Sequence, residues 1–65
     1  MINGKLVKEL RLKRGLSQSE LAKLVGFYEK SMISRIENGL VNDIPLSKAV
    51  QLAKVLKVNP IDLVT

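Results

Sequence analysis

Side chains that can donate hydrogen bonds lie close together in the segment Ile33 to Ile36 and just before it. With these two isoleucines taken as the inward positions of a helix, the outward positions are polar: Lys30, Ser31, Ser34 and Arg35. An arginine can donate two parallel hydrogen bonds to a guanine edge, and a lysine can donate to guanine or to phosphate. A serine is short enough to let the helix approach closely. This chemistry is suited to reading base edges.

The preceding segment could present such a helix. Ser17 and Glu20 form the S-x-x-E pattern of a capping box, so a helix is expected to begin at Gln18. Gly26 permits a positive φ where this helix ends, and the next helix is expected over about residues 29–38. Two short helices joined in this way can enter the DNA major groove. Gln18, at a helix N-terminus, is then placed to contact a phosphate.

Apolar spacing predicts how these two helices are supported. A first helix with Ile2, Leu6 and Leu10 on one side is expected to end near Arg14. The helix that begins at Gln18 is expected to bury Leu21, Leu24 and Val25.

The remainder of the chain predicts two more helices. A fourth helix is expected to begin near Pro45, because proline is favoured in a first turn. Its predicted buried face comprises Leu46, Ala49, Val50, Leu52, Ala53 and Leu56. Asn59 and Pro60 give the start signal for a short fifth helix. Five helices and no strand are therefore expected, in one domain spanning residues 1–65.

Composition narrows the classes of function. The chain has 65 residues, no Cys and no His, so we expect neither a thiolate metal site nor a histidine base, no metal or cofactor, and no enzymatic activity. The net charge is +5, and residues 1–40 hold eight of the eleven basic side chains, which favours a polyanionic partner. The absence of a long apolar run predicts a cytoplasmic protein without a membrane partner.

The motifs SQSELAKLVG and ISRIENG, with the closing pattern LAKVL-x-V-x-P-x-D-L, resemble helix-turn-helix proteins of the phage repressor and Cro type, also called XRE-like. These are bacterial and phage transcriptional regulators, and the resemblance covers nearly the whole chain. It implies an all-α, compact five-helix domain like that of the lambda repressor, with the helix-turn-helix at helices 2 and 3. It also implies binding to operator DNA, usually as a homodimer on a pseudo-palindrome.

The resemblance carries functional residues onto this sequence position by position. It implies contacts to DNA bases by Gln18, Lys30, Ser31 and Arg35. It also implies a bridge between the first and third helices, made by Arg11 and Glu37, and a phosphate contact by Asn38. The complete set of predicted phosphate contacts is Ser17, Gln18, Tyr28, Ser34 and Asn38. For Ser17 a structural cap is the main role, and Tyr28 is either a phosphate donor or a solvated turn residue.

The sequence departs from the family pattern between Gly26 and Gly39, which are one residue further apart than is usual. Either the turn is longer, with Phe27 in the core, or the third helix is longer and brings Tyr28 or Glu29 into the groove. The intact spacing of the two inward isoleucines favours the longer turn.

Other readings of the chain stay open at this point. The preferred function is a sequence-specific regulator of transcription, a repressor, that binds duplex DNA and needs no small-molecule ligand. The alternative is an antitoxin-like or protein-interaction module. For a homodimer the candidate contacts are Ile61, Leu63 and Val64, although all three could belong to the core. Lysines late in the chain are expected to be solvated surface: Lys48, Lys54 and Lys57.

Overall fold

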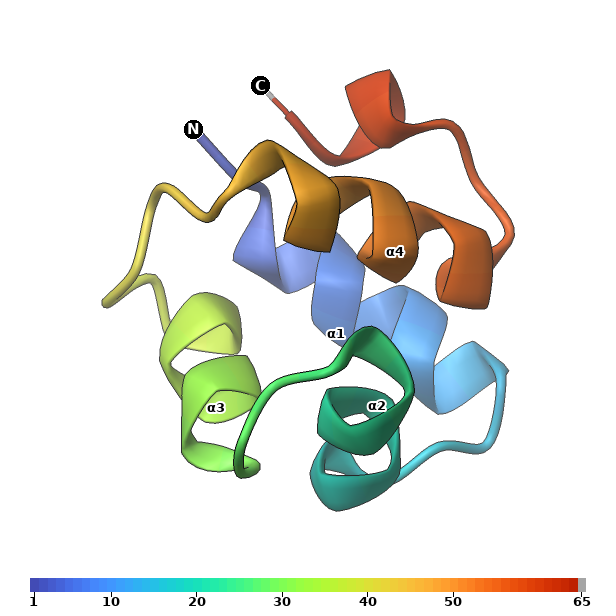
Figure 1. Ribbon diagram of the computed structural model, residues 1–65. Helices are drawn as coiled ribbons and strands as arrows, with labels where there is room; N and C mark the ends of the chain where they lie inside the picture. Colours follow the sequence, from blue (N-terminus) through green and yellow to red (C-terminus); the bar gives the residue numbers. More distant parts are fainter. Residues whose placement is uncertain (65) are drawn as a thin grey trace.

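The computed structural model describes residues 1–64 of the chain, which form four α-helices and one short 3-10 helix. Their bounds are α1 (Gly4–Lys13), α2 (Gln18–Val25), α3 (Ser31–Glu37), α4 (Leu46–Leu56) and η1 (Pro60–Leu63). In Figure 1, α1 runs through the middle of the domain, α2 and α3 lie side by side below it, and α4 and η1 lie above. Within residues 1–64 no helix is long and apolar enough to cross a bilayer.

The core is aliphatic, as the low aromatic content predicts, and every helix contributes to it. Its ten buried residues are Val7, Leu21, Ala22, Val25, Ile33, Ile36, Leu52, Ala53, Leu56 and Leu63. Since α2 and α3 are only eight and seven residues long, neither would be stable as an isolated helix. Their helical state and their orientation therefore depend on this packing.

Two leucines that were predicted to be buried are exposed. On α2 the buried positions are Leu21, Ala22 and Val25, and Leu24 lies outside this stripe, where no other element covers it. On α4 the exposed leucine of the predicted buried face is Leu46. It is the first residue of the helix and precedes the part that packs on the core. Helical spacing identified the buried stripe, but it did not reveal how far the neighbouring elements extend over it.

The last predicted helix is the 3-10 helix η1, because the chain turns back to the N-terminus after only four residues. Asn59 is the N-cap and Pro60 is the first helical residue, so the predicted start signal is present, and the amide of Asn59 also donates to the carboxylate of Asp62 at 3.3 Å. A segment this short ends before an α-helical ladder can develop. The amide of Asn3 donates to the Leu63 carbonyl at 2.7 Å, and Ile2 forms an isolated antiparallel bridge with Val64.

Gly4 allows α1 to approach α3 closely, a contact that the sequence did not reveal. A Cβ atom at this position would stand 1.9 Å from the Ile36 carbonyl oxygen and 3.2 Å from the Glu37 Cα. Both neighbours belong to the backbone, which cannot rotate away as a side chain could. Only glycine therefore lets the start of α1 contact the end of α3 in this way.

We expect Gly4→Ala to destabilise the domain by about 1–3 kcal/mol, the usual cost of overpacking. The sign is informative, because alanine in place of glycine normally stabilises a helix by roughly 0.5–1 kcal/mol. The measurement is the free energy of unfolding in urea. Lys5→Ala, at an exposed position of the same helix, is the control and should leave it nearly unchanged. A Gly4→Ala protein as stable as the wild type would contradict the close contact.

Candidate nucleic-acid interface

Helix α3 turns its apolar side to the core and its polar side outward. Ile33 and Ile36 are fully buried, whereas Lys30, just before the helix, and Arg35 are exposed. Ser31 is half-buried on the same segment. The side chains predicted to read bases are therefore accessible, and we call Lys30, Ser31 and Arg35 the reading edge.

The turn before α3 contains the additional residue. The predicted helix over residues 29–38 is shorter in the structure, because the turn continues through Lys30 and the helix begins at Ser31. Phe27 is half-buried against the core, and Tyr28 is fully exposed. The longer turn favoured by the sequence is thus the arrangement found. Tyr28 is therefore accessible to a ligand, and its contact to a phosphate stays a prediction.

A carboxylate also lies at the beginning of the reading edge. The Ser31 hydroxyl donates a hydrogen bond to the carboxylate of Glu29 at 2.9 Å, and Glu29 is exposed. At the other end of α3, the side-chain amide of Asn38 donates to the Ser34 hydroxyl at 3.3 Å. The two predicted phosphate contacts Ser34 and Asn38 are therefore neighbours on one side of the helix.

The N-terminus of α2 has the predicted capping box. The amide of Glu20 donates to the Ser17 hydroxyl at 3.0 Å, and the amide of Ser17 donates to the Glu20 carboxylate at 2.9 Å. Hydrogen bonding of the Glu20 carboxylate to the Ser17 backbone amide, and to a lesser extent to the Ser17 side chain, lowers the pKa of Glu20 below its usual value. Ser17 is exposed, so its capping role leaves it accessible at the end of the helix.

A buried ionic network joins the three N-terminal helices. Arg11 Nε donates to Glu37 Oε2 at 2.6 Å, and Arg11 Nη2 donates to Glu37 Oε1 at 3.2 Å, so the predicted bridge is present. A third donor, Gln18 Nε2, lies 3.0 Å from Glu37 Oε1. The Glu37 side chain is only 2% exposed, and Arg11 is 7% exposed. Arg11 Nη1 also donates to the Leu16 carbonyl at 2.8 Å.

The network changes the interpretation of Gln18. The sequence predicted it as a contact to bases and phosphates, and the structure places it half-buried with one amide N–H already donated to Glu37. A glutamine amide has two N–H groups and a carbonyl, so its remaining capacity is still available. The structure therefore shows a bracing role for Gln18, and its contact to DNA stays a prediction.

Lys48 is a second residue whose position differs from expectation. It was predicted to be solvated surface, but it is half-buried, and its ammonium donates to the Gly26 carbonyl at 3.1 Å. The Val25 carbonyl lies at 3.5 Å and the Phe27 ring centroid at 5.8 Å. No motif signals this contact, because it depends on how α4 packs beside α2.

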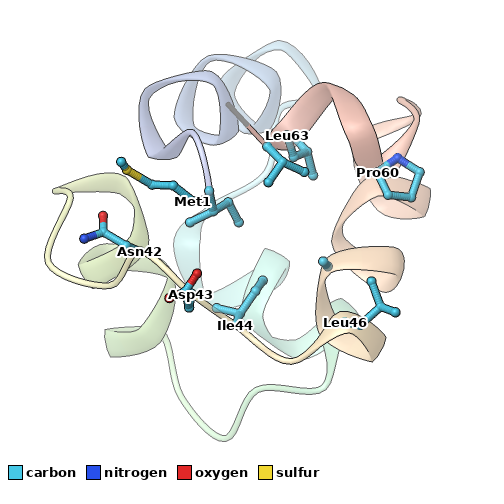
Figure 2. A pocket seen from close by; sticks show the side chains of 10 residues that line it. Met1, Asn42, Asp43, Ile44, Leu46, Pro60 and Leu63 are labelled. Carbon is cyan, nitrogen blue, oxygen red and sulfur yellow. The ribbon is translucent and has the colours of Figure 1, made fainter.

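The predicted dimer contacts do not share one environment. Leu63 is 1% exposed and belongs to the core, so it is not available to a partner, whereas Ile61 is 76% exposed and Val64 is also exposed. Near them is an open hollow of about 180 Å³, which Figure 2 shows beside the chain termini. We call it the terminal hollow, and its lining includes Met1, Ile44, Leu46, Pro60 and Leu63.

The comparisons with known proteins agree with this geometry. The model of the Helix-turn-helix family HTH_3 matches residues 7–63, and the chain belongs to that family. The P22 c2 repressor, solved with a synthetic operator, superimposes with a TM-score of 0.89 at 25% identity, covering 100% of this chain and 96% of that chain. The fold is therefore the all-α, lambda-repressor-like helix-turn-helix fold. A comparison with curated proteins finds no match.

Two further solved structures are similar. SinR, a master regulator for biofilm formation solved in complex with DNA, has a TM-score of 0.83 at 33% identity, with 92% of this chain and 94% of that chain covered. The restriction-modification controller protein C.AhdI from Aeromonas hydrophila has a TM-score of 0.80 at 35% identity, with 92% and 88% covered. A chain of the SinR/SinI complex has a TM-score of 0.84 at 35% identity. The match covers 97% of this chain but only 59% of that chain, so this chain spans little more than half of its length.

We expect Arg11→Met to cost about 3–5 kcal/mol, because it leaves the Glu37 carboxylate buried without its ionic partner. A chain of this length has a total stability of roughly 3–10 kcal/mol, so the single variant is close to unfolding. The double variant Arg11→Met/Glu37→Met should be more stable than Arg11→Met alone, because it removes the uncompensated charge. The measurement is chemical unfolding of the single variants and the double variant. A double variant that is less stable than Arg11→Met would contradict this account of the network.

Proposed function

We propose that this protein binds duplex DNA sequence-specifically and regulates transcription, acting as a repressor that occludes a promoter. The observation that carries the proposal is the reading edge. Lys30, Ser31 and Arg35 are accessible on a helix whose opposite side is fixed in the core by Ile33 and Ile36. A rigid helix with exposed donors is what direct readout in the major groove requires. The structural relatives solved with DNA support this choice of ligand.

The charge distribution supports the same proposal. Net charge is +5, and most basic side chains lie in residues 1–40, which include α1, α2 and α3. Neutralising phosphates with such side chains releases counterions and provides affinity that does not depend on sequence. Ser17, Gln18 and Tyr28, with the pair Ser34 and Asn38, are the proposed phosphate contacts that fix the register of the helix.

Binding and release of DNA need no chemical step, and we propose that the protein is neither an enzyme nor dependent on a cofactor or small-molecule ligand. The chain has no Cys and no His, which removes the commonest metal ligands and general base. The proposed ligand is cellular DNA, so we expect the protein to act in the cytoplasm.

We further propose that two copies bind a pseudo-palindromic operator. Ile61 and Val64 are exposed, and Val64 lines the terminal hollow together with Met1 and Leu46, which add exposed apolar surface. A two-fold dimer uses the same patch on both copies. Its reading edges would contact half-sites about one helical turn, ~34 Å, apart.

Arg35→Ala should weaken binding to the preferred duplex by about 1–3 kcal/mol and relax the preference at one base pair. The preferred duplex is obtained by selecting bound fragments from random duplex DNA, and affinities are then measured on that fragment and on single-base variants. Arg14→Ala removes the same charge from an exposed position of the chain and is the matched control. It should weaken binding to all sequences to a similar extent. If Arg35→Ala behaves in the same way, Arg35 is a phosphate contact.

The dimer proposal predicts two copies on the selected duplex in sedimentation experiments. Ile61→Asp should reduce the complex to one copy and weaken binding, because the variant places a charge in the proposed apolar interface. Leu12→Asp introduces the same carboxylate at another exposed aliphatic residue, away from the terminal hollow, and should leave the assembly unchanged. A wild-type protein that sediments as a monomer with and without DNA would refute the dimer.

A further inference from the structure

Lys48 connects α4 to the turn between α2 and α3. Its ammonium donates to the Gly26 carbonyl at 3.1 Å, with the Val25 carbonyl at 3.5 Å and the Phe27 ring at 5.8 Å. The approach is close enough that a Cβ on Gly26 would stand 2.9 Å from Lys48 Nζ. Val25, the last residue of α2, and the two residues after it are therefore all neighbours of one cation.

The chemistry of this contact is favourable. The last carbonyl groups of a helix have no partner within the helix and carry the negative end of its dipole. An ammonium group has three donors and no acceptor, so it can donate to these carbonyl oxygens without accepting a hydrogen bond from any backbone amide of the helix. The Phe27 ring offers a third favourable neighbour, since an aromatic face attracts a cation. Lys48 is thus a C-terminal cap that α4 supplies to α2.

The turn is fixed by backbone hydrogen bonds at its two ends, and at the α3 end the Ser34 amide donates to the Lys30 carbonyl at 3.0 Å. The amides of Gly26 and Phe27 both donate to the Ala22 carbonyl, which fixes the first two residues. After them the turn stands away from α2, and an open groove of about 430 Å³ lies between them. That groove is lined by Ser19, Lys23, Phe27, Tyr28, Glu29 and Lys30.

We propose that Lys48 is a positioning residue that holds the long turn, and through it the N-terminal end of the reading edge, in the orientation required to discriminate bases. The inference rests on the proposed DNA-binding function. Lys48 lies on α4, outside the helix-turn-helix, and it acts through the backbone of Val25 and Gly26. Without the ammonium, the turn that leads into Lys30 and Ser31 is held less firmly, so discrimination between bases is lost before the general attraction to phosphates is weakened.

The test uses Lys48→Met, which keeps the apolar stem but removes the ammonium. Lys48→Arg keeps the charge and the donors, and Lys54→Met removes the same charge from an exposed position on α4. Affinity is measured for a duplex selected by the wild type and for an unrelated duplex, at a temperature where urea unfolding shows every variant to be folded. Amide hydrogen exchange of Gly26 and Phe27 is measured without DNA.

We expect Lys48→Met to lower the ratio of specific to non-specific affinity about tenfold, the equivalent of one hydrogen bond to a charged group. It should also speed exchange of the Gly26 and Phe27 amides. Lys54→Met should weaken binding to both duplexes equally and leave the ratio unchanged. Lys48→Arg should keep the ratio close to that of the wild type.

Two failures can be told apart. If the wild type binds neither duplex, the proposed function is wrong, whatever the exchange data show. If the wild type discriminates between the duplexes and Lys48→Met changes the ratio no more than Lys54→Met, the positioning role of Lys48 is wrong. Unchanged exchange at Gly26 and Phe27 in folded Lys48→Met would also overturn it, because the cap would then contribute nothing to the turn.

Discussion

The structure depends most on one buried carboxylate, that of Glu37. A charge with 2% exposure is costly unless it is paired and hydrogen-bonded. Here the partners come from two other helices, Arg11 of α1 and Gln18 of α2, and together they supply three hydrogen bonds. Since each bond requires a particular distance, the relative position of the three helices is constrained. Apolar packing alone would tolerate small rotations that this network does not.

The position of α3 is determined from both of its ends. At the C-terminal end, the Glu37 network and the close approach of Gly4 fix its place against α1. In the middle, Ile33 and Ile36 are fully buried. At the N-terminal end the long turn is held chiefly by Phe27 and by the contact from α4. A helix of seven residues thus obtains from its neighbours the rigidity that its own hydrogen bonds cannot give.

Features set by local hydrogen bonding were predictable from the sequence. The capping box and the left-handed Gly26 follow from residues within a few positions of one another, whereas the additional residue in the turn was found by comparison with the family pattern. The Arg11 bridge was predictable only through the family resemblance. Features that depend on distant neighbours were not predictable: the exposure of Leu24 and Leu46, the contact at Gly4 and the cap by Lys48. Each of these features depends on where another helix lies, or on how far it extends.

The two ends of the chain give the domain a second face of different character. A hydrogen bond from Asn3 to Leu63 and the bridge between Ile2 and Val64 join the two ends of the chain, and a hydrogen bond from Ile2 to Asn42 ties them to the loop before α4. A domain of this size cannot bury all of its apolar surface, and part of the excess, including Met1, Leu46 and Val64, lines the terminal hollow. The polar reading edge and this apolar face belong to different ends of a body only 24 × 22 × 20 Å in extent. Pairing through the apolar face would therefore leave both copies of α3 free for DNA.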